Sequence, residues 1–117
     1  MIPIPKSKEH ILESWPRPAE SPGYTVLRGD PQTDGCFIQG NNTTPTRLGI
    51  WRCTEGTFEV TERGDELQTL IKGRLRLTGE DGVTHEYGPG DSIFTRKGER
   101  VIWDIRETVE KVFYAVA

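Results

Sequence analysis

Short strand-like runs, each closed by a turn, fill the chain from Tyr24 to its C-terminus, and this pattern restricts the possible folds severely. The runs are rich in β-branched, aromatic and aliphatic residues, and polar stretches with Gly, Pro, Asn or Asp separate them. Asp81-Gly82 between two such runs is a strong hairpin signal. Runs this short and this regularly spaced favour an antiparallel sandwich or barrel. No long amphipathic helix pattern follows residue 22, so the sequence predicts an all-β fold.

The turn residues also set the expected limits of each strand. Gly-Asp-Pro, Gly-Asn-Asn, Arg-Gly-Asp and Gly-Pro-Gly-Asp stretches mark loops or tight turns between the apolar runs. The predicted strands cover residues 24–27, 36–39, 48–53, 57–61, 67–71, 74–78, 83–87, 92–95, 101–105 and 112–116.

A charged, Pro-rich arm precedes these strands. Ser7 can cap a short helix that runs through Trp15 and that Pro16 and Pro18 terminate. An arm of this length does not fold alone, so it is either frayed or docked on its own barrel or on a partner subunit. The sequence therefore predicts an arm over residues 1–22 and a single domain over residues 23–117.

Composition and charge argue against several classes of function. The net charge of -3 leaves no basic footprint for nucleic acid or for an anionic membrane. No apolar run reaches the length of a membrane-spanning helix, and the N-terminus lacks the apolar segment of a signal peptide. Cys36 and Cys53 have no metal-binding spacing. We expect a cytoplasmic protein whose partner is a small molecule.

Two stretches carry the spacing of a known family. Glu66 and Gly73 fit the end of the first of two cupin motifs, and Gly90-Asp91 with Gly98 fits the second. The chain resembles the cupin superfamily, and is similar in particular to single-domain cupins related to ureidoglycine aminohydrolase and the ethanolamine-utilisation cupin. This closer resemblance covers about residues 25–117 and rests on Gly49-Ile50-Trp51-Arg52-Cys53-Thr54, Gly56, Phe58, Asp65-Glu66, Gly73, Gly88-Pro89-Gly90-Asp91, Trp103 and Lys111.

The resemblance implies a cupin jelly roll, which is a small double-sheet antiparallel β-barrel, but the metal ligands of the family are replaced. The histidines of the first motif would fall at Val60 and Glu62, or one residue earlier in each case, and that of the second at Val101. In the aminohydrolase the ligands include a Glu, two His and a Gln, and the matching positions here are Val60, Glu62, Glu66 and Val101. Iron or manganese in such a site needs imidazole ligands. We therefore expect no cofactor, since two carboxylates alone hold only a hard, weakly bound ion.

The alternation of side chains along strands predicts which residues face the barrel interior. If Glu66 points inward, as the resemblance implies, Gln68 shares its face, and Trp103 points inward with Val101. The predicted pocket consists of four polar or aromatic residues and four apolar wall residues: Glu62, Glu66, Gln68 and Trp103, with Phe58, Val60, Leu70 and Val101. Either Trp51 or Arg52 closes the rim, and Arg96 points either into the mouth or to water.

Three functions are compatible with this pocket. The favoured one is metal-free binding of a small polar or cationic metabolite by Glu62, Glu66, Gln68 and Trp103, with Phe58 as a wall. Alternatively, because burial and mutual repulsion raise the pKa of one of two neighbouring carboxylates, Glu62 and Glu66 can be the acid and base of a metal-independent hydrolase or isomerase. The third is a structural role in a homodimer with an exchanged arm.

Purely structural roles are also open for the same residues. Glu66 can pair with a nearby cation, Arg63, Lys72 or Arg76, and Glu62 can be a solvated turn residue. Trp103 can simply fill the core.

Overall fold

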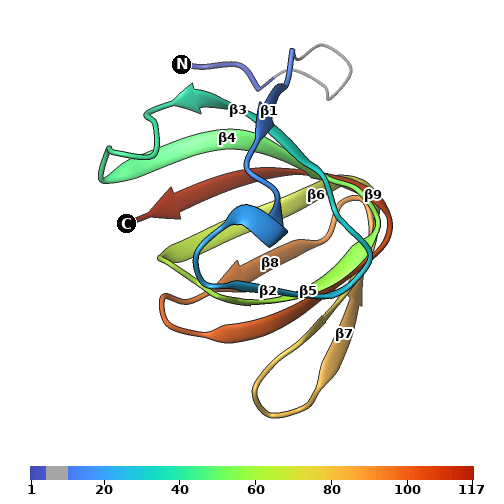
Figure 1. Ribbon diagram of the computed structural model, residues 1–117. Helices are drawn as coiled ribbons and strands as arrows, with labels where there is room; N and C mark the ends of the chain where they lie inside the picture. Colours follow the sequence, from blue (N-terminus) through green and yellow to red (C-terminus); the bar gives the residue numbers. More distant parts are fainter. Residues whose placement is uncertain (5–10) are drawn as a thin grey trace.

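The computed structural model describes residues 1–4 and 11–117, and it shows a curled antiparallel sheet that forms a small β-barrel (Figure 1). This confirms the all-β prediction. Among the described residues, no helix has the length and hydropathy that crossing a membrane requires. The elements in chain order are β1 (Glu13–Trp15), the 3-10 turn η2 (Pro18–Glu20), β2 (Tyr24–Arg28), β3 (Thr33–Gln39), β4 (Thr46–Cys53), β5 (Gly56–Thr61), β6 (Asp65–Thr78), β7 (Thr84–Tyr87), β8 (Ser92–Thr95) and β9 (Arg100–Val116).

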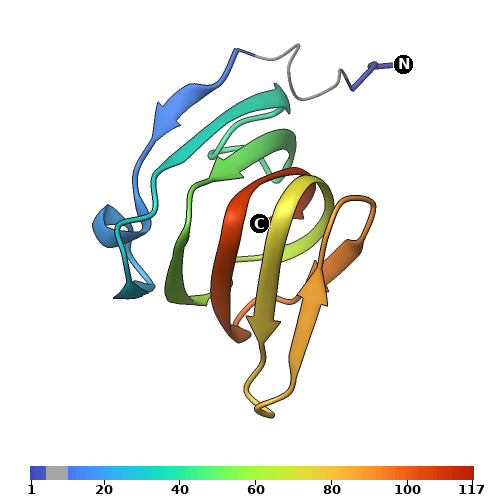
Figure 2. The ribbon, with the colours of Figure 1, turned by 90° about the vertical axis from the view of Figure 1, so that its right-hand side faces the viewer.

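The long strand β9 is the centre of the barrel. One of its edges pairs with β5 through residues 100–105 and with β4 through residues 109–116. Its other edge pairs with β6 over nearly the whole length of both strands, and the two strands curve side by side in Figure 2. The sheet continues in the order β1-β3-β4-β9-β5-β2, while β7 and β8 pair with the two ends of β6.

The sequence predicted β6 and β9 as two strands each, and this was wrong. Residues 67–71 and 74–78 belong to one strand, and so do residues 101–105 and 112–116. Gly73 interrupts the apolar pattern of β6 without ending the strand, because the β6–β9 register shifts there through bulges. A bulge lets one strand bend and serve both halves of a barrel, and the sequence pattern gives the same signal for a bulge as for a turn.

Gly73 is required at this bend by its backbone and by its surroundings. Its φ is +88°, which L-residues rarely adopt. A Cβ atom built there would lie 2.2 Å from the carbonyl oxygen of Thr108 on the neighbouring strand β9. The bend therefore depends on a glycine at this position.

The barrel interior holds one apolar cluster. Aliphatic and aromatic side chains from β4, β5, β6, β8 and β9 pack there, and Phe58 stacks on Trp103 with ring centroids 6.2 Å apart. Phe58, Val60 and Trp103 of this cluster also line a cavity. The buried members of the cluster are Cys53, Phe58, Val60, Leu70, Leu75, Leu77, Ile93, Val101, Trp103, Ile105 and Val109.

The N-terminal arm docks on the barrel as an edge strand. β1 pairs with β3 in antiparallel register, and the Trp15 ring lies 5.0 Å from that of Phe37. Trp15 also covers Gly35, where a Cβ atom would come within 2.3 Å of the indole. The predicted helix is thus wrong at Glu13–Trp15, since backbone pairing with β3 replaces it, and residues 7–10 of that prediction lie outside the described residues.

Candidate functional site

Cross-strand register brings the polar side chains together on the inner face of the barrel. Arg47 on β4, Ala115 on β9 and Glu66 on β6 form one row of aligned residues. Trp51 on β4 and Lys111 on β9 form a second row, deeper in the barrel. The long Lys111 side chain crosses the space between the two rows and reaches Glu66.

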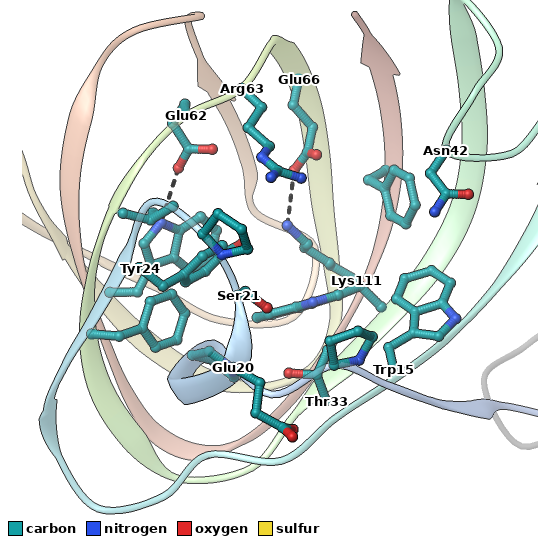
Figure 3. Close-up of a pocket in the computed structure, with 18 of the residues that line it drawn as sticks. Trp15, Glu20, Ser21, Tyr24, Thr33, Asn42, Glu62, Arg63, Glu66 and Lys111 are labelled. Atoms are coloured by element: carbon teal, nitrogen blue, oxygen red, sulfur yellow. Dashed lines mark hydrogen bonds and ion pairs between the residues drawn. The ribbon is translucent and has the colours of Figure 1, made fainter.

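A cavity of about 420 Å³ opens above the apolar cluster. Figure 3 shows Glu62, Arg63 and Glu66 at one end of it and Lys111 in its interior. The arm forms one wall through residues 15, 16, 18 and 20–22, so the cavity includes a part of the chain that the sequence prediction left outside the pocket. The remaining wall residues are Tyr24, Thr33, Phe37, Asn42, Arg47, Trp51, Phe58, Val60, Trp103 and Phe113.

Lys111 is the buried cation of the site, with an exposed fraction of 5%. Its ammonium donates to Glu66 Oε2 at 2.8 Å and to the side-chain oxygen of Gln68. It also lies 4.5 Å from the ring centroid of Trp51 and 4.7 Å from that of Trp103. An ammonium group has three donors, so one N–H is left over after these two bonds.

Glu62 is the second carboxylate of the site, and it has no cation in direct contact among the described residues. Trp103 Nε1–H donates to Glu62 Oε1 at 3.1 Å, which fixes the carboxylate at the cavity wall (Figure 3). Burial raises the pKa of Glu62 to about 7, while Lys111 opposes this increase and Glu66 adds to it. Near neutral pH, Glu62 can therefore accept a proton or a hydrogen bond.

Four of the five predicted site residues line the cavity, namely Glu62, Glu66, Trp103 and Phe58. Gln68 does not line it: its side chain is fully buried below, where its Nε2 donates to Thr95 Oγ1 at 3.0 Å. Gln68 therefore holds Lys111 in place from beneath and does not face the open space. The sequence placed Gln68 on the correct side of the strand but could not give its depth.

Lys111 is the residue that the strand-parity argument missed. It has the same parity as Phe113 and Ala115, which also face inward, but the predicted strand began one residue later. Glu66 does pair with a cation, as its structural interpretation required, yet the partner is Lys111 instead of Arg63, Lys72 or Arg76.

The structure also decides the two questions of orientation that strand parity left open. Trp51 lines the cavity, whereas Arg52 pairs with Asp34 on the outer face. Arg96 is not among the residues around this cavity and lines a separate depression near β7 and β8. The arginines at the mouth are Arg47 and Arg63.

The side chains at the positions of the cupin metal ligands do not suit a metal centre. Val60 and Val101 pair directly across β5 and β9, and both are buried apolar side chains. The Lys111 ammonium occupies the coordination space of Glu66, where it would repel a metal cation. Among residues 1–4 and 11–117, no three His, Cys, Asp or Glu side chains are grouped to hold a metal ion.

Comparison with solved structures places the fold among cupins. The putative ethanolamine utilization protein Q of Salmonella typhimurium is 20% identical, with a TM-score of 0.63 over 73% of this chain and 69% of that chain. EutQ of Clostridium difficile is also 20% identical, with a TM-score of 0.64 over 74% and 68%. A DUF861-family protein of unknown function from Pseudomonas syringae is 22% identical, with a TM-score of 0.81 over 95% of this chain but 46% of that chain.

These identities show a shared fold and no shared activity. No curated protein matches the chain, and the closer relation to ureidoglycine aminohydrolase stays a prediction. Residues 41–113, more than half of the chain, match the family model of the EutQ-like cupin domain. The chain therefore belongs to the EutQ-like cupin family, and its barrel is a cupin fold.

Proposed function

We propose that this cupin binds a small polar metabolite in the barrel mouth through protein side chains, with Glu62 as the main contact. The supporting observation is the state of Glu62, which lies at the cavity wall with Oε1 held by Trp103 and with no cation in contact among the described residues. A carboxylate that is desolvated in this way gains free energy when a ligand donates a hydrogen bond to it.

The chemistry of the wall defines the part of the ligand that Glu62 binds. Glu62 Oε2 accepts an N–H or O–H group, and a protonated amine makes the stronger, charge-assisted bond. Trp51 and Trp103 supply flat apolar surface beside it. A few polar groups in a mostly apolar cavity are typical of small-molecule sites.

A binding screen with matched variants tests this function. Amines, ureides and small acids are screened by thermal shift, and each compound that stabilises the wild type is titrated calorimetrically. Glu62→Gln should weaken binding at least about tenfold, because the amide is a weaker acceptor than a carboxylate. Glu59→Gln is the control, since Glu59 lies on β5 shortly before Glu62, with its side chain on the outer face, 3.7 Å from Arg100.

Two results would contradict the proposal. One is a compound that binds in the cavity with the same affinity in Glu62→Gln as in the wild type. The other is an equal loss in Glu59→Gln, which would indicate that the loss comes from the fold and not from the contact.

A second candidate function is metal-independent acid-base catalysis, and the pKa of Glu62 supports it. A carboxyl group with a pKa near 7 can both give and take a proton at neutral pH, which is the property of a general acid or base. Lys111 binds Glu66 at the same cavity wall. If a turnover is found, its rate should depend on pH around 7 in the wild type, and an unchanged profile in Glu62→Gln would remove Glu62 from the mechanism.

A further inference from the structure

We infer that the ligand of this cavity also carries a carboxylate, which Arg47 and Arg63 bind at the mouth, so that the ligand is a small zwitterion of the amino-acid type. This inference rests on the proposed function, because it assigns the opposite end of the same ligand. Such a ligand differs from a simple amine in carrying an acid group, which would face the solvent side of the cavity.

The first observation is that, within residues 1–4 and 11–117, the two arginines at the mouth have no carboxylate partner. Arg47 donates only to the backbone carbonyl of Asn42, at 3.4 Å, and Arg63 forms no ion pair with any residue of the described part of the chain. By contrast, Arg17 in the N-terminal arm pairs with Glu20 and Asp30. Both mouth arginines nevertheless line the cavity beside Glu62 and Glu66.

The second observation is that Arg47 and Arg63 meet from different elements around one small space. Arg47 projects from β4 in the same cross-strand row as Glu66, and Arg63 belongs to the turn between β5 and β6. They line a recess of about 150 Å³ that adjoins the main cavity, together with Tyr24, Val60, Gly64, Ala115 and the carboxylates of Glu62 and Glu66. Of these two carboxylates, Glu66 is already paired with Lys111. Two guanidinium groups around a recess of this size suit a carboxylate, which accepts paired N–H bonds from arginine.

The charges of the site favour a zwitterion over a simple amine. Glu66 and Lys111 neutralise each other at 2.8 Å. This pairing leaves Glu62 as one carboxylate against two guanidinium groups, Arg47 and Arg63. An amine that approached Glu62 without an acid group would be repelled by both arginines, whereas a zwitterion would satisfy the two ends of the cavity.

Matched pairs of probes separate the two ends of the ligand. Glycine, β-alanine and γ-aminobutyrate are titrated calorimetrically beside their amides, which keep the ammonium and lose only the carboxylate. At least one acid should bind about tenfold or more tightly than its amide. The homologues cover different distances between the two charges.

Substitutions of the two arginines at the mouth then show which residues cause the preference for the acid over the amide. Arg47→Gln and Arg63→Gln should each remove most of the preference for the acid, because the acid binds more weakly while the affinity for the amide stays the same or rises once one repelling charge is gone. Arg96→Gln is the control, because Arg96 is an exposed arginine outside this cavity. Glu62→Gln should weaken the binding of the acid and of the amide by a similar factor. This result tests the proposed function separately from the role of the two arginines.

The inference is overturned if no acid binds more tightly than its amide. It is also overturned if the preference survives in both Arg47→Gln and Arg63→Gln, or if Arg96→Gln removes it. Circular dichroism and melting temperatures of each variant confirm that the fold is intact before affinities are compared.

Discussion

At the scale of single residues, Glu62 and Lys111 determine how the cavity is charged. Lys111 is buried between two tryptophans and is bound by Glu66 and Gln68, so its charge is compensated within the protein. Among the residues that the structure describes, the Trp103 indole is the only donor to the Glu62 carboxylate, so the charge of Glu62 is compensated poorly. A ligand that donates a hydrogen bond to Glu62 would therefore improve this compensation.

The stability of the free protein should fall as Glu62 ionises. The pKa of Glu62 rises from 4.5 in the unfolded chain to about 7 in the fold, so the folded state binds more protons between these values. Stability from this group is thus fully present below pH 4.5 and is lost as pH rises through 7. Between pH 5 and pH 8, the wild type should lose about 10 °C of melting temperature relative to Glu62→Gln. A constant difference between the two proteins would contradict the assigned environment of Glu62.

Removing the buried ammonium of Lys111 should lower the stability of the protein. Lys111→Met leaves Glu66 and Gln68 without their donor, and breaking a buried ion pair costs about 3 kcal/mol of unfolding free energy. Lys72→Met is the control, because Lys72 is exposed on the same sheet, and it should change stability by less than about 0.5 kcal/mol. Chemical denaturation measures both, and equal values would show that Lys111 is not part of the folded core.

At the scale of elements, the bend in β6 sets the shape of the barrel. Gly73→Ala places a Cβ atom 2.2 Å from the Thr108 carbonyl oxygen at a φ of +88°. Gly82→Ala has a similar φ of +79° with nothing within 4 Å. Gly73→Ala should therefore be at least about 2 kcal/mol more destabilising than Gly82→Ala, the difference being the overpacking term. Equal losses in denaturation experiments would mean that the bend tolerates a side chain.

The same elements show how far the sequence alone could lead. Turn residues and period-two patterns predicted the all-β class. The cupin resemblance placed Glu66 and Val101 on the inner face, and strand parity then added Trp103 and Phe58. The pattern could not distinguish the bulge at Gly73 from a turn, and so it divided β6 and β9. Parity also gives no orientation for a residue outside a predicted strand, and Lys111 lies one residue before the strand predicted over residues 112–116.

At the scale of the whole molecule, the arm completes the cavity. β1 pairs with β3 of the same chain, and Arg17 binds Asp30 at 2.6 Å. We therefore expect that deletion of residues 1–20 leaves the mass in solution unchanged and weakens ligand binding, because one wall is removed. Light scattering after size exclusion measures the mass, and a lower mass would show that the arm joins two subunits. The expected homodimer itself stays a prediction.

The central claim is that the barrel mouth recognises a ligand through Glu62 and without a metal. The most direct test is calorimetric titration of a ligand from the screen into chelator-treated protein, wild type and Glu62→Gln side by side. The account predicts that chelation leaves wild-type affinity unchanged and that Glu62→Gln weakens it about tenfold or more. Binding that returns only when a metal is added, or that is equal in both proteins, would contradict it.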